Sequence, residues 1–178
     1  MLKNDTDAEK NKKRFSLKDI IFTTIFTISF IVQIILMFLF FNELDIIILL
    51  YIGYVIWGFS LYFGFISFWT FKKRGAVEKG KSYLYTTKVV DRGPYAIIRH
   101  PQYLGGILFT ISITFWTQIW LSLILSIIIL ILTYQWTYAE DKNLIDKFGE
   151  DYKKYKAKVP RLNPLLGIIK YFILRKRG

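Results

Sequence analysis

Two polar stretches beside long apolar runs hold the side chains whose types and spacing suit chemistry. The first covers residues 91–106, contains Arg99-His100-Pro101 and leads directly into an apolar run. Pro101 suits the first turn of a helix, where free backbone amides, the helix dipole and Arg99 could together hold an anion. The second is the acidic pair Glu140-Asp141 at the far end of that run. Ionisable residues at the edge of a bilayer are costly unless they are paired or functional, so both stretches are candidate sites.

Each of these residues also has a plain structural explanation when it is taken alone. Arg99 and His100 could be interface residues at a helix start, and the acidic pair could be solvated beside Lys142. Tyrosines are frequent anchors at membrane interfaces, which would account for Tyr95 and Tyr103. Only the ordered combination of these residues favours a functional site.

The elements that must position both stretches are three uncharged runs, residues 20–41, 46–71 and 103–139. The first has 22 residues and reaches about 33 Å as a helix, enough to cross a hydrocarbon core of about 30 Å. The last has 37 residues, too many for one crossing, with a cluster of Trp and Gln at residues 116–120 near its middle. We therefore predict an all-α integral membrane protein with four transmembrane helices, the last two forming a helical hairpin.

Charge placement supports four crossings and orients them. All 25 Lys and Arg fall in three blocks, before residue 19, between 72 and 99, and from 142 onward. Basic residues gather on the cytoplasmic side of membranes, and four crossings put all three blocks on one side. We expect both termini and the site to be cytoplasmic. The chain reads as a single membrane domain, 1–178, with a basic N-terminus (1–19), a cytoplasmic pre-hairpin loop (72–102) and a cytoplasmic or interfacial C-terminal segment (140–178).

The C-terminal segment has two parts. Residues 140–158 show the spacing of an amphipathic helix. Residues 165–174 are apolar but too short to span, and a basic end follows them, as suits an interfacial anchor on anionic lipid.

Composition excludes several classes of site and partner. The chain has no Cys and one His, which rules out thiolate zinc sites, iron–sulfur clusters, a cysteine nucleophile and multi-His metal sites, so we expect no metal. The net charge of +12 is explained by membrane topology, and we expect no nucleic-acid partner. The oligomeric state is left open.

Five elements in order resemble the isoprenylcysteine carboxyl methyltransferase family and its phospholipid methyltransferase relatives. They are an Arg-His-Pro-x-Tyr-x-Gly box over residues 99–105, the helical hairpin, the acidic pair, a Phe-Gly-x-x-Tyr-x-x-Tyr stretch over 148–155, and Pro160-Arg161 with Pro164. The stretch 87–95, which ends in Gly93-Pro94-Tyr95, precedes the box and shares in the resemblance. The chain departs from the family pattern at Asp141, where the family usually has a second Glu.

The resemblance implies an integral membrane methyltransferase that uses S-adenosylmethionine, enclosed between the hairpin, the pre-hairpin loop and the C-terminal helix. Carried over by motif position, the cofactor-binding residues would be Val90, Gly93, Pro94, Tyr95, His100, Tyr103, Leu104 and Glu140. The catalytic candidates are Glu140, which would position acceptor or cofactor, and Arg99 and Arg161, which would orient the acceptor.

The implied acceptor is a lipid-soluble or lipidated molecule. An isoprenylcysteine-type carboxylate is the first expectation, and a phospholipid amine, for which Glu140 would be the base, is the alternative. Two other functions stay open from the residues. A sterol-type reductase would use NADPH and share the hairpin, but it usually has Asn where this chain has Gln102. A non-catalytic membrane scaffold would bind neither cofactor.

Overall fold

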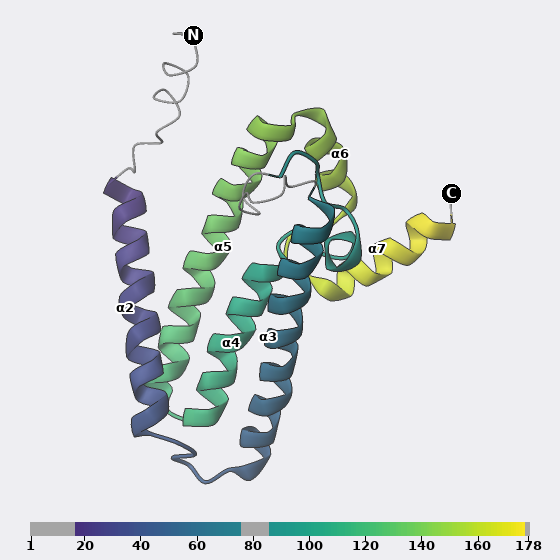
Figure 1. The fold of residues 1–178 in the computed structure, drawn as a ribbon. Coiled ribbons are helices and arrows are strands. Elements are labelled where there is room, and N and C mark those ends of the chain that lie inside the picture. The colour runs from purple at the N-terminus through teal and green to yellow at the C-terminus, as the bar shows by residue number, and fades with distance from the viewer. Residues whose placement is uncertain (1–16, 76–85, 177–178) are drawn as a thin grey trace.

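The computed structural model describes residues 17–75 and 86–176, and the regular structure among these residues is helical, with no strand. The helices are α2 (Leu17–Leu39), α3 (Ile47–Arg74), α4 (Pro101–Thr117), α5 (Trp120–Phe148), α6 (Glu150–Lys158) and α7 (Pro164–Lys176), with a short 3-10 helix η2 (Gly93–Ala96) (Figure 1). The predicted all-α class is confirmed for this part of the chain. Most of the predicted basic N-terminus lies outside the described residues.

Three of the described helices, α2, α3 and α5, are long and apolar enough to cross a membrane. They contain 23, 28 and 29 residues. Helix α4 has 17 residues and reaches about 26 Å, so helix length supports three spans directly and leaves the fourth crossing a prediction. The protein is a multi-pass integral membrane protein.

The predicted hairpin is confirmed, and it turns at Gln118 and Ile119. Gln118 takes the left-handed backbone conformation, with φ of 56°, a region that costs energy for most side chains. Its side chain holds the turn in place by donating to Asn42 Oδ1 at 2.7 Å and to the Ile46 carbonyl at 3.0 Å. The turn between α4 and α5 is therefore fastened to the connection between α2 and α3.

Helix α5 differs from the predicted boundary, because it continues past Ala139 as far as Phe148. The sequence placed the start of a separate amphipathic helix at residue 140. In the structure the chain breaks at Gly149, which has φ of 58°, and α6 follows. Asp141 therefore lies inside the long helix α5, where its carboxylate needs partners.

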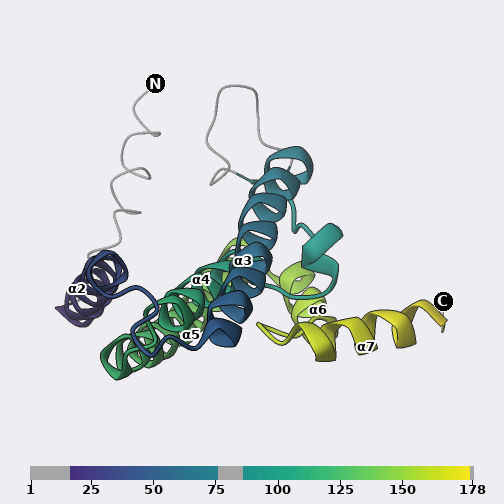
Figure 2. The same cartoon turned by 90° about the horizontal axis from the view of Figure 1, so that it is seen from below.

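Helix α4 lies between α3 and α5 in the bundle, and α2 runs along α5 and α4 (Figures 1 and 2). Gly105 permits a close approach of α4 to α3, since a Cβ there would lie 3.1 Å from both the Gly64 nitrogen and the Ser60 carbonyl oxygen. Ser60 Oγ donates to the Gly105 carbonyl at 2.9 Å. On the other side Gln33 of α2, fully buried, donates to the Thr110 carbonyl at 3.0 Å. These contacts fix the positions of α2 and α3 on the hairpin.

The C-terminal helices fold back against the start of α4. Tyr152, Tyr155 and Val159 form a small core on which Val89, Leu144, Ile145 and Phe148 pack. The backbone N–H of Arg99 donates to the Pro160 carbonyl at 2.9 Å, and that of His100 donates to the Arg161 carbonyl at 3.2 Å. Helix α7 then extends sideways from the bundle (Figures 1 and 2).

Candidate functional site

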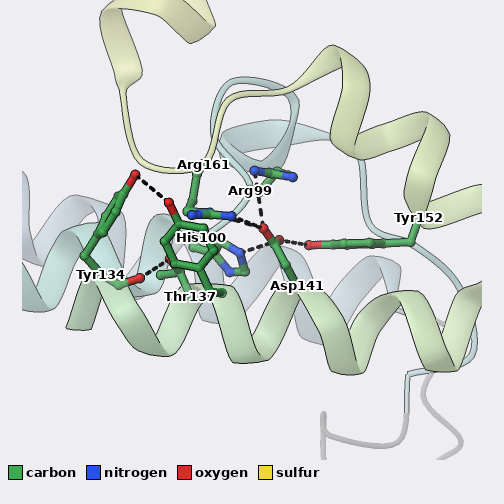
Figure 3. Close-up of polar contacts among 8 residues, drawn as sticks. Arg99, His100, Tyr134, Thr137, Asp141, Tyr152 and Arg161 are labelled. Atoms are coloured by element: carbon green, nitrogen blue, oxygen red, sulfur yellow. Dashed lines mark hydrogen bonds and ion pairs between the residues drawn. The ribbon is translucent and has the colours of Figure 1, made fainter. Parts of the chain in front are cut away.

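Asp141 on α5 is the centre of a buried polar cluster (Figure 3). The residue is 2% exposed, and its carboxylate contacts four side chains. Oδ1 accepts a hydrogen bond from the Tyr152 hydroxyl at 2.7 Å and lies 2.9 Å from His100 Nε2. Oδ2 accepts from Arg161 Nε at 3.1 Å and Nη2 at 2.8 Å, and it lies 3.4 Å from Arg99 Nη2. A buried carboxylate is tolerated when its oxygens are satisfied in this way.

These partners come from separate parts of the chain. Arg99 and His100 precede α4, whose first residue is Pro101. Tyr152 is on α6, and Arg161 follows α6. A single carboxylate thus joins the start of α4, the end of α5 and the segment after α5, which is the region where the sequence placed the site.

Burial and hydrogen bonding fix the protonation states of the tyrosines and of Arg161. Burial raises the pKa of the Tyr152 hydroxyl, and its hydrogen bond to Asp141 raises it further, so it stays a neutral donor. Burial also raises the pKa of Tyr155, which donates to the Tyr95 carbonyl at 2.7 Å. Burial alone would lower the pKa of Arg161, but its hydrogen bonds to Asp141 and Tyr138 outweigh that effect and raise it. Arg161 therefore stays charged.

A polar cavity of about 450 Å³ lies beside this cluster, within the range of about 300–1,000 Å³ common for small-molecule sites. Six of the residues predicted for the site line it, namely Val90, Tyr95, Arg99, His100, Tyr103 and Glu140. They come from the pre-hairpin loop, the start of α4 and α5. The fold brings together residues that are 50 positions apart in the sequence.

Four predicted residues lie outside the lining. Gly93, with φ of 64°, and Pro94 form η2, the turn that carries Tyr95 to the cavity wall. Leu104 is half-buried in the first turn of α4. The Arg161 guanidinium is held between Asp141 and the ring of Tyr138, with Cζ 3.4 Å from the ring centroid.

The structure adds lining residues that were not singled out from the sequence. They include Phe71 on α3 and Asn143 and Lys147 on α5. Tyr152 on α6, the first Tyr of the Phe-Gly-x-x-Tyr-x-x-Tyr stretch, also lines the cavity. The helical spacing of Glu140, Asn143 and Lys147 could have indicated a shared face, because residues three and four apart lie together on a helix.

Arg99 is the feature of the cavity that points most clearly to a ligand. It is 9% exposed and lines the cavity, and its Nε and Nη1 are buried without a hydrogen-bond partner. Buried donors are normally satisfied. The guanidinium is therefore suited to an anionic group in the cavity, bound by two N–H donors.

S-adenosylmethionine, the cofactor that the sequence resemblance implies, has a carboxylate, an ammonium group, a sulfonium group and an adenine ring, and the cavity lining can be compared with each. A sulfonium and an ammonium group are stabilised by a carboxylate or by aromatic faces, and the cavity offers Glu140, Tyr95 and Tyr103. The rings of Phe71 and Tyr95 lie 5.5 Å apart and provide an apolar wall for a flat ring. Arg99 suits the amino-acid carboxylate. The residues present therefore fit this cofactor.

A second cavity of about 690 Å³ lies within the apolar part of the bundle. Its walls come from the four long helices, including Phe26 and Phe30 of α2 and Phe65 and Phe68 of α3. It shares Gln102 and Tyr103 with the polar cavity. An apolar space thus adjoins the polar cavity at the start of α4.

Within residues 17–75 and 86–176, no group of three or more His, Asp or Glu side chains is placed to hold a metal ion. The acidic pair does not form such a group, because Asp141 is occupied by its cationic and hydroxyl partners.

Several helices long enough to span a membrane, with a polar cavity where they end and an apolar cavity between them, define an integral membrane protein. The family model for phospholipid methyltransferase matches residues 48–151, more than half of the chain. The protein belongs to this family, and it is a membrane methyltransferase by family. The match runs from the start of α3 into α6 and includes the hairpin and Asp141. No curated protein and no solved structure matches the chain.

Proposed function

We propose that the protein transfers a methyl group from S-adenosylmethionine to a lipid-soluble acceptor, with an isoprenylcysteine-type carboxylate as the preferred acceptor. The observation that carries this proposal is the contact between the two cavities. The polar one has charged and aromatic walls, the apolar one has walls from the spanning helices, and they share Gln102 and Tyr103. A water-soluble donor and a lipid chain could thus meet at the start of α4.

In this proposal the polar cavity holds the cofactor. Arg99 pairs with an anionic group, Glu140 and the tyrosine faces stabilise positive charge, and Val90 and Tyr95 contribute apolar wall. His100 is positioned by Asp141, which lies 2.9 Å from Nε2. Gly93 and Pro94 act indirectly by shaping η2, and Leu104 supports the first turn of α4.

When bound, S-adenosylmethionine would supply an electrophilic methyl group, and its sulfur would keep the electron pair of the broken bond as the acceptor takes up the methyl group. The protein's part is to align the acceptor and to exclude water. Tyr103, which contributes to both cavities, is placed to align the two ligands. Its ring stands edge-on to that of His100 at 5.6 Å between centroids.

Arg99 favours a carboxylate acceptor. A carboxylate is already ionised, so methylation requires no base, and a buried guanidinium with two free donors is suited to hold it. The same donors suit the cofactor carboxylate, and the experiment below separates the two roles. Arg161 would act on the acceptor only through Asp141, because the guanidinium is already engaged there.

A phospholipid amine is the second candidate acceptor, and the family match favours it. An amine must lose a proton to be methylated, so a base is required. Glu140 lines the polar cavity and is half-buried. Its carboxylate would act as that base.

We also propose that α4 crosses the membrane as well, which gives four transmembrane helices with both termini and the site on the cytoplasmic side. The distribution of Lys and Arg supports this orientation, and the hairpin returns the chain to the side from which it entered. Cysteine substitutions, in a chain that has none of its own, would test it. A cysteine at Lys156 should react with a membrane-impermeant maleimide only after the cells are permeabilised. A cysteine at Leu44 should react with it in intact cells.

The function is tested by incubating the full protein in native lipid with a methyl-labelled donor and extracting the labelled lipid. A methyl ester releases the label as volatile methanol in alkali, whereas an N-methyl group retains it. Alkali-labile label supports the carboxylate acceptor, and alkali-stable label supports the amine. No transfer to any extractable molecule, with cofactor bound, contradicts the proposal.

Three variants assign the residues. For a carboxylate acceptor, Arg99→Gln should lower kcat at saturating donor. Glu140→Gln should then keep at least a tenth of the wild-type kcat. For an amine acceptor, Glu140→Gln should reduce kcat about 100-fold, the lower end of the usual range for a general base. If Arg99 binds only the cofactor, Arg99→Gln raises the KM for the donor and leaves kcat unchanged. Asp146→Asn, an exposed change on the same helix, is the matched control.

A further inference from the structure

A third cavity, of about 840 Å³, lies between the pre-hairpin loop, α6 and α7. Its charged lining residues are Lys88, Lys154 and Lys158, with Asp91 and Asp151. The three cations outnumber the two carboxylates, so the lining carries a net positive charge. This cavity adjoins the polar cavity, with which it shares Lys88, Val89, Phe148 and Tyr155. Lys154 and Lys158 do not line the polar cavity, and the proposed methyl transfer gives none of the three lysines a role.

Helix α6 supplies the basic side of this cavity through its spacing. Lys154 and Lys158 are four residues apart and lie on one face of α6, and both are exposed. Tyr152 and Tyr155 of the same helix are buried. Lys153 and Lys156, on the same helix, are exposed but do not line the cavity. One helix therefore carries a lysine pair at the cavity and a second pair away from it.

Helix α7 bounds the cavity through Tyr171 and is apolar almost all round. Leu165 is 73% exposed, and Ile169 and Phe172 are each more than half exposed. Gly167 permits the start of α7 to pack closely against the turn after η2, because a Cβ there would overlap the Ile97 carbonyl oxygen. The helix runs sideways from the bundle (Figure 2). An exposed apolar helix across the bundle direction is suited to the interface plane of a bilayer.

We propose that this third cavity binds the headgroup of an anionic membrane phospholipid, with its phosphate on Lys88, Lys154 and Lys158 and its acyl chains along α7. Charge complementarity favours this occupant. Each lysine near an anionic membrane surface adds about fivefold in affinity, and the two carboxylates offset part of that gain. The lining has one more lysine than it has carboxylates. A zwitterionic lipid has no net charge to pair with this excess positive charge, so it should bind more weakly than an anionic lipid.

The test uses the full protein in detergent, titrated with short-chain phosphatidylglycerol or short-chain phosphatidylcholine and read by native mass spectrometry of bound lipid. The test variant K88Q/K154Q/K158Q removes the three cavity lysines. The control variant K142Q/K153Q/K156Q removes three exposed lysines that do not line the cavity. Both variants have the same net charge, so a difference between them reports position. Inorganic phosphate at equal concentration is the competitor for a free-anion site.

We expect phosphatidylglycerol to bind at least tenfold more tightly than phosphatidylcholine. The test variant should lose at least tenfold in affinity, and the control variant less than twofold. Equal losses in both variants, equal binding of the two lipids, or displacement of the lipid by equimolar inorganic phosphate would each overturn the proposal. The measurement requires no methyl transfer, and the three lysines have no role in the proposed reaction, so failure of this proposal is distinguishable from failure of the proposed function.

Discussion

Replacing Asp141 with Asn is expected to destabilise the protein strongly, because Asp141 is the only carboxylate that contacts the guanidinium groups of Arg99 and Arg161 in the described site. Asp141 is 2% exposed, and its carboxylate contacts four polar side chains. Asn has nearly the same shape but is neutral, and its amide nitrogen would face donors. Two cationic side chains would then lack their counter-ion.

The size of the effect follows from burial. Breaking a buried ion pair by removing one partner costs about 3–5 kcal/mol. For a chain of this size, 1 kcal/mol changes Tm by about 2–4 °C, so Asp141→Asn should lower Tm by about 6–20 °C. Since Arg99 and His100 line the polar cavity, cofactor affinity should fall as well.

The assay is thermal unfolding of the purified protein in detergent, followed by circular dichroism and by loss of monodisperse protein. Asp146→Asn is the matched control, since Asp146 is exposed on the same helix five residues further on. The control should change Tm by less than about 2 °C, as surface substitutions usually do. Equal changes for the two variants would refute the role assigned to Asp141.

Three further predictions concern the surroundings of the site. Tyr152→Phe should cost about 1.5–3 kcal/mol in the same unfolding assay, because it removes a hydrogen bond to a charged group at 2.7 Å; an unchanged Tm would contradict this. Gly106→Leu should raise the KM for the lipid acceptor at least tenfold and leave donor affinity unchanged, since Gly106 lines the apolar cavity and has open space beside it. The control Gly58→Leu, also in open space but outside that cavity, should leave both constants unchanged. Gln33→Leu should lower stability by about 1 kcal/mol, the range measured for hydrogen bonds between membrane helices, and an increase in stability would show that the buried amide contributes nothing.

The helices and the hairpin follow from local patterns. Uncharged runs of 22 and 37 residues indicate long apolar helices by length alone, and the polar cluster around Gln118 marks the turn. The convergence of the candidate residues was also accessible, because residues at both ends of one hairpin must lie at the same end of the bundle. Six of the predicted site residues line one cavity for this reason.

The role of Asp141 was not accessible from the sequence. Its partners Tyr152 and Arg161 are brought to it by the fold of α6 onto the start of α4, a long-range arrangement that no periodicity encodes. The same arrangement explains why α5 continues past Ala139 to Phe148. A charged pair such as Glu140-Asp141 indicates the end of a membrane-spanning segment only when both charges are solvated, and Asp141 is buried. Arg161 was expected at the acceptor for its motif position, whereas the structure places it on Asp141.

The shorter acidic side chain at this position suits its surroundings. Asp141 contacts His100, Tyr152 and both arginines with nearly complete burial, so the extra methylene of Glu would have to displace packed groups. Overpacking of this kind costs about 1–3 kcal/mol.

Binding of S-adenosylmethionine in the polar cavity at the start of α4 is tested most directly by calorimetric titration of the purified protein with S-adenosylhomocysteine. We predict one bound molecule per chain, weaker binding for Asp141→Asn measured below its Tm, unchanged binding for Asp146→Asn, and no binding of NADPH. Failure of the folded protein to bind S-adenosylhomocysteine, or tight binding of NADPH in its place, would contradict the account.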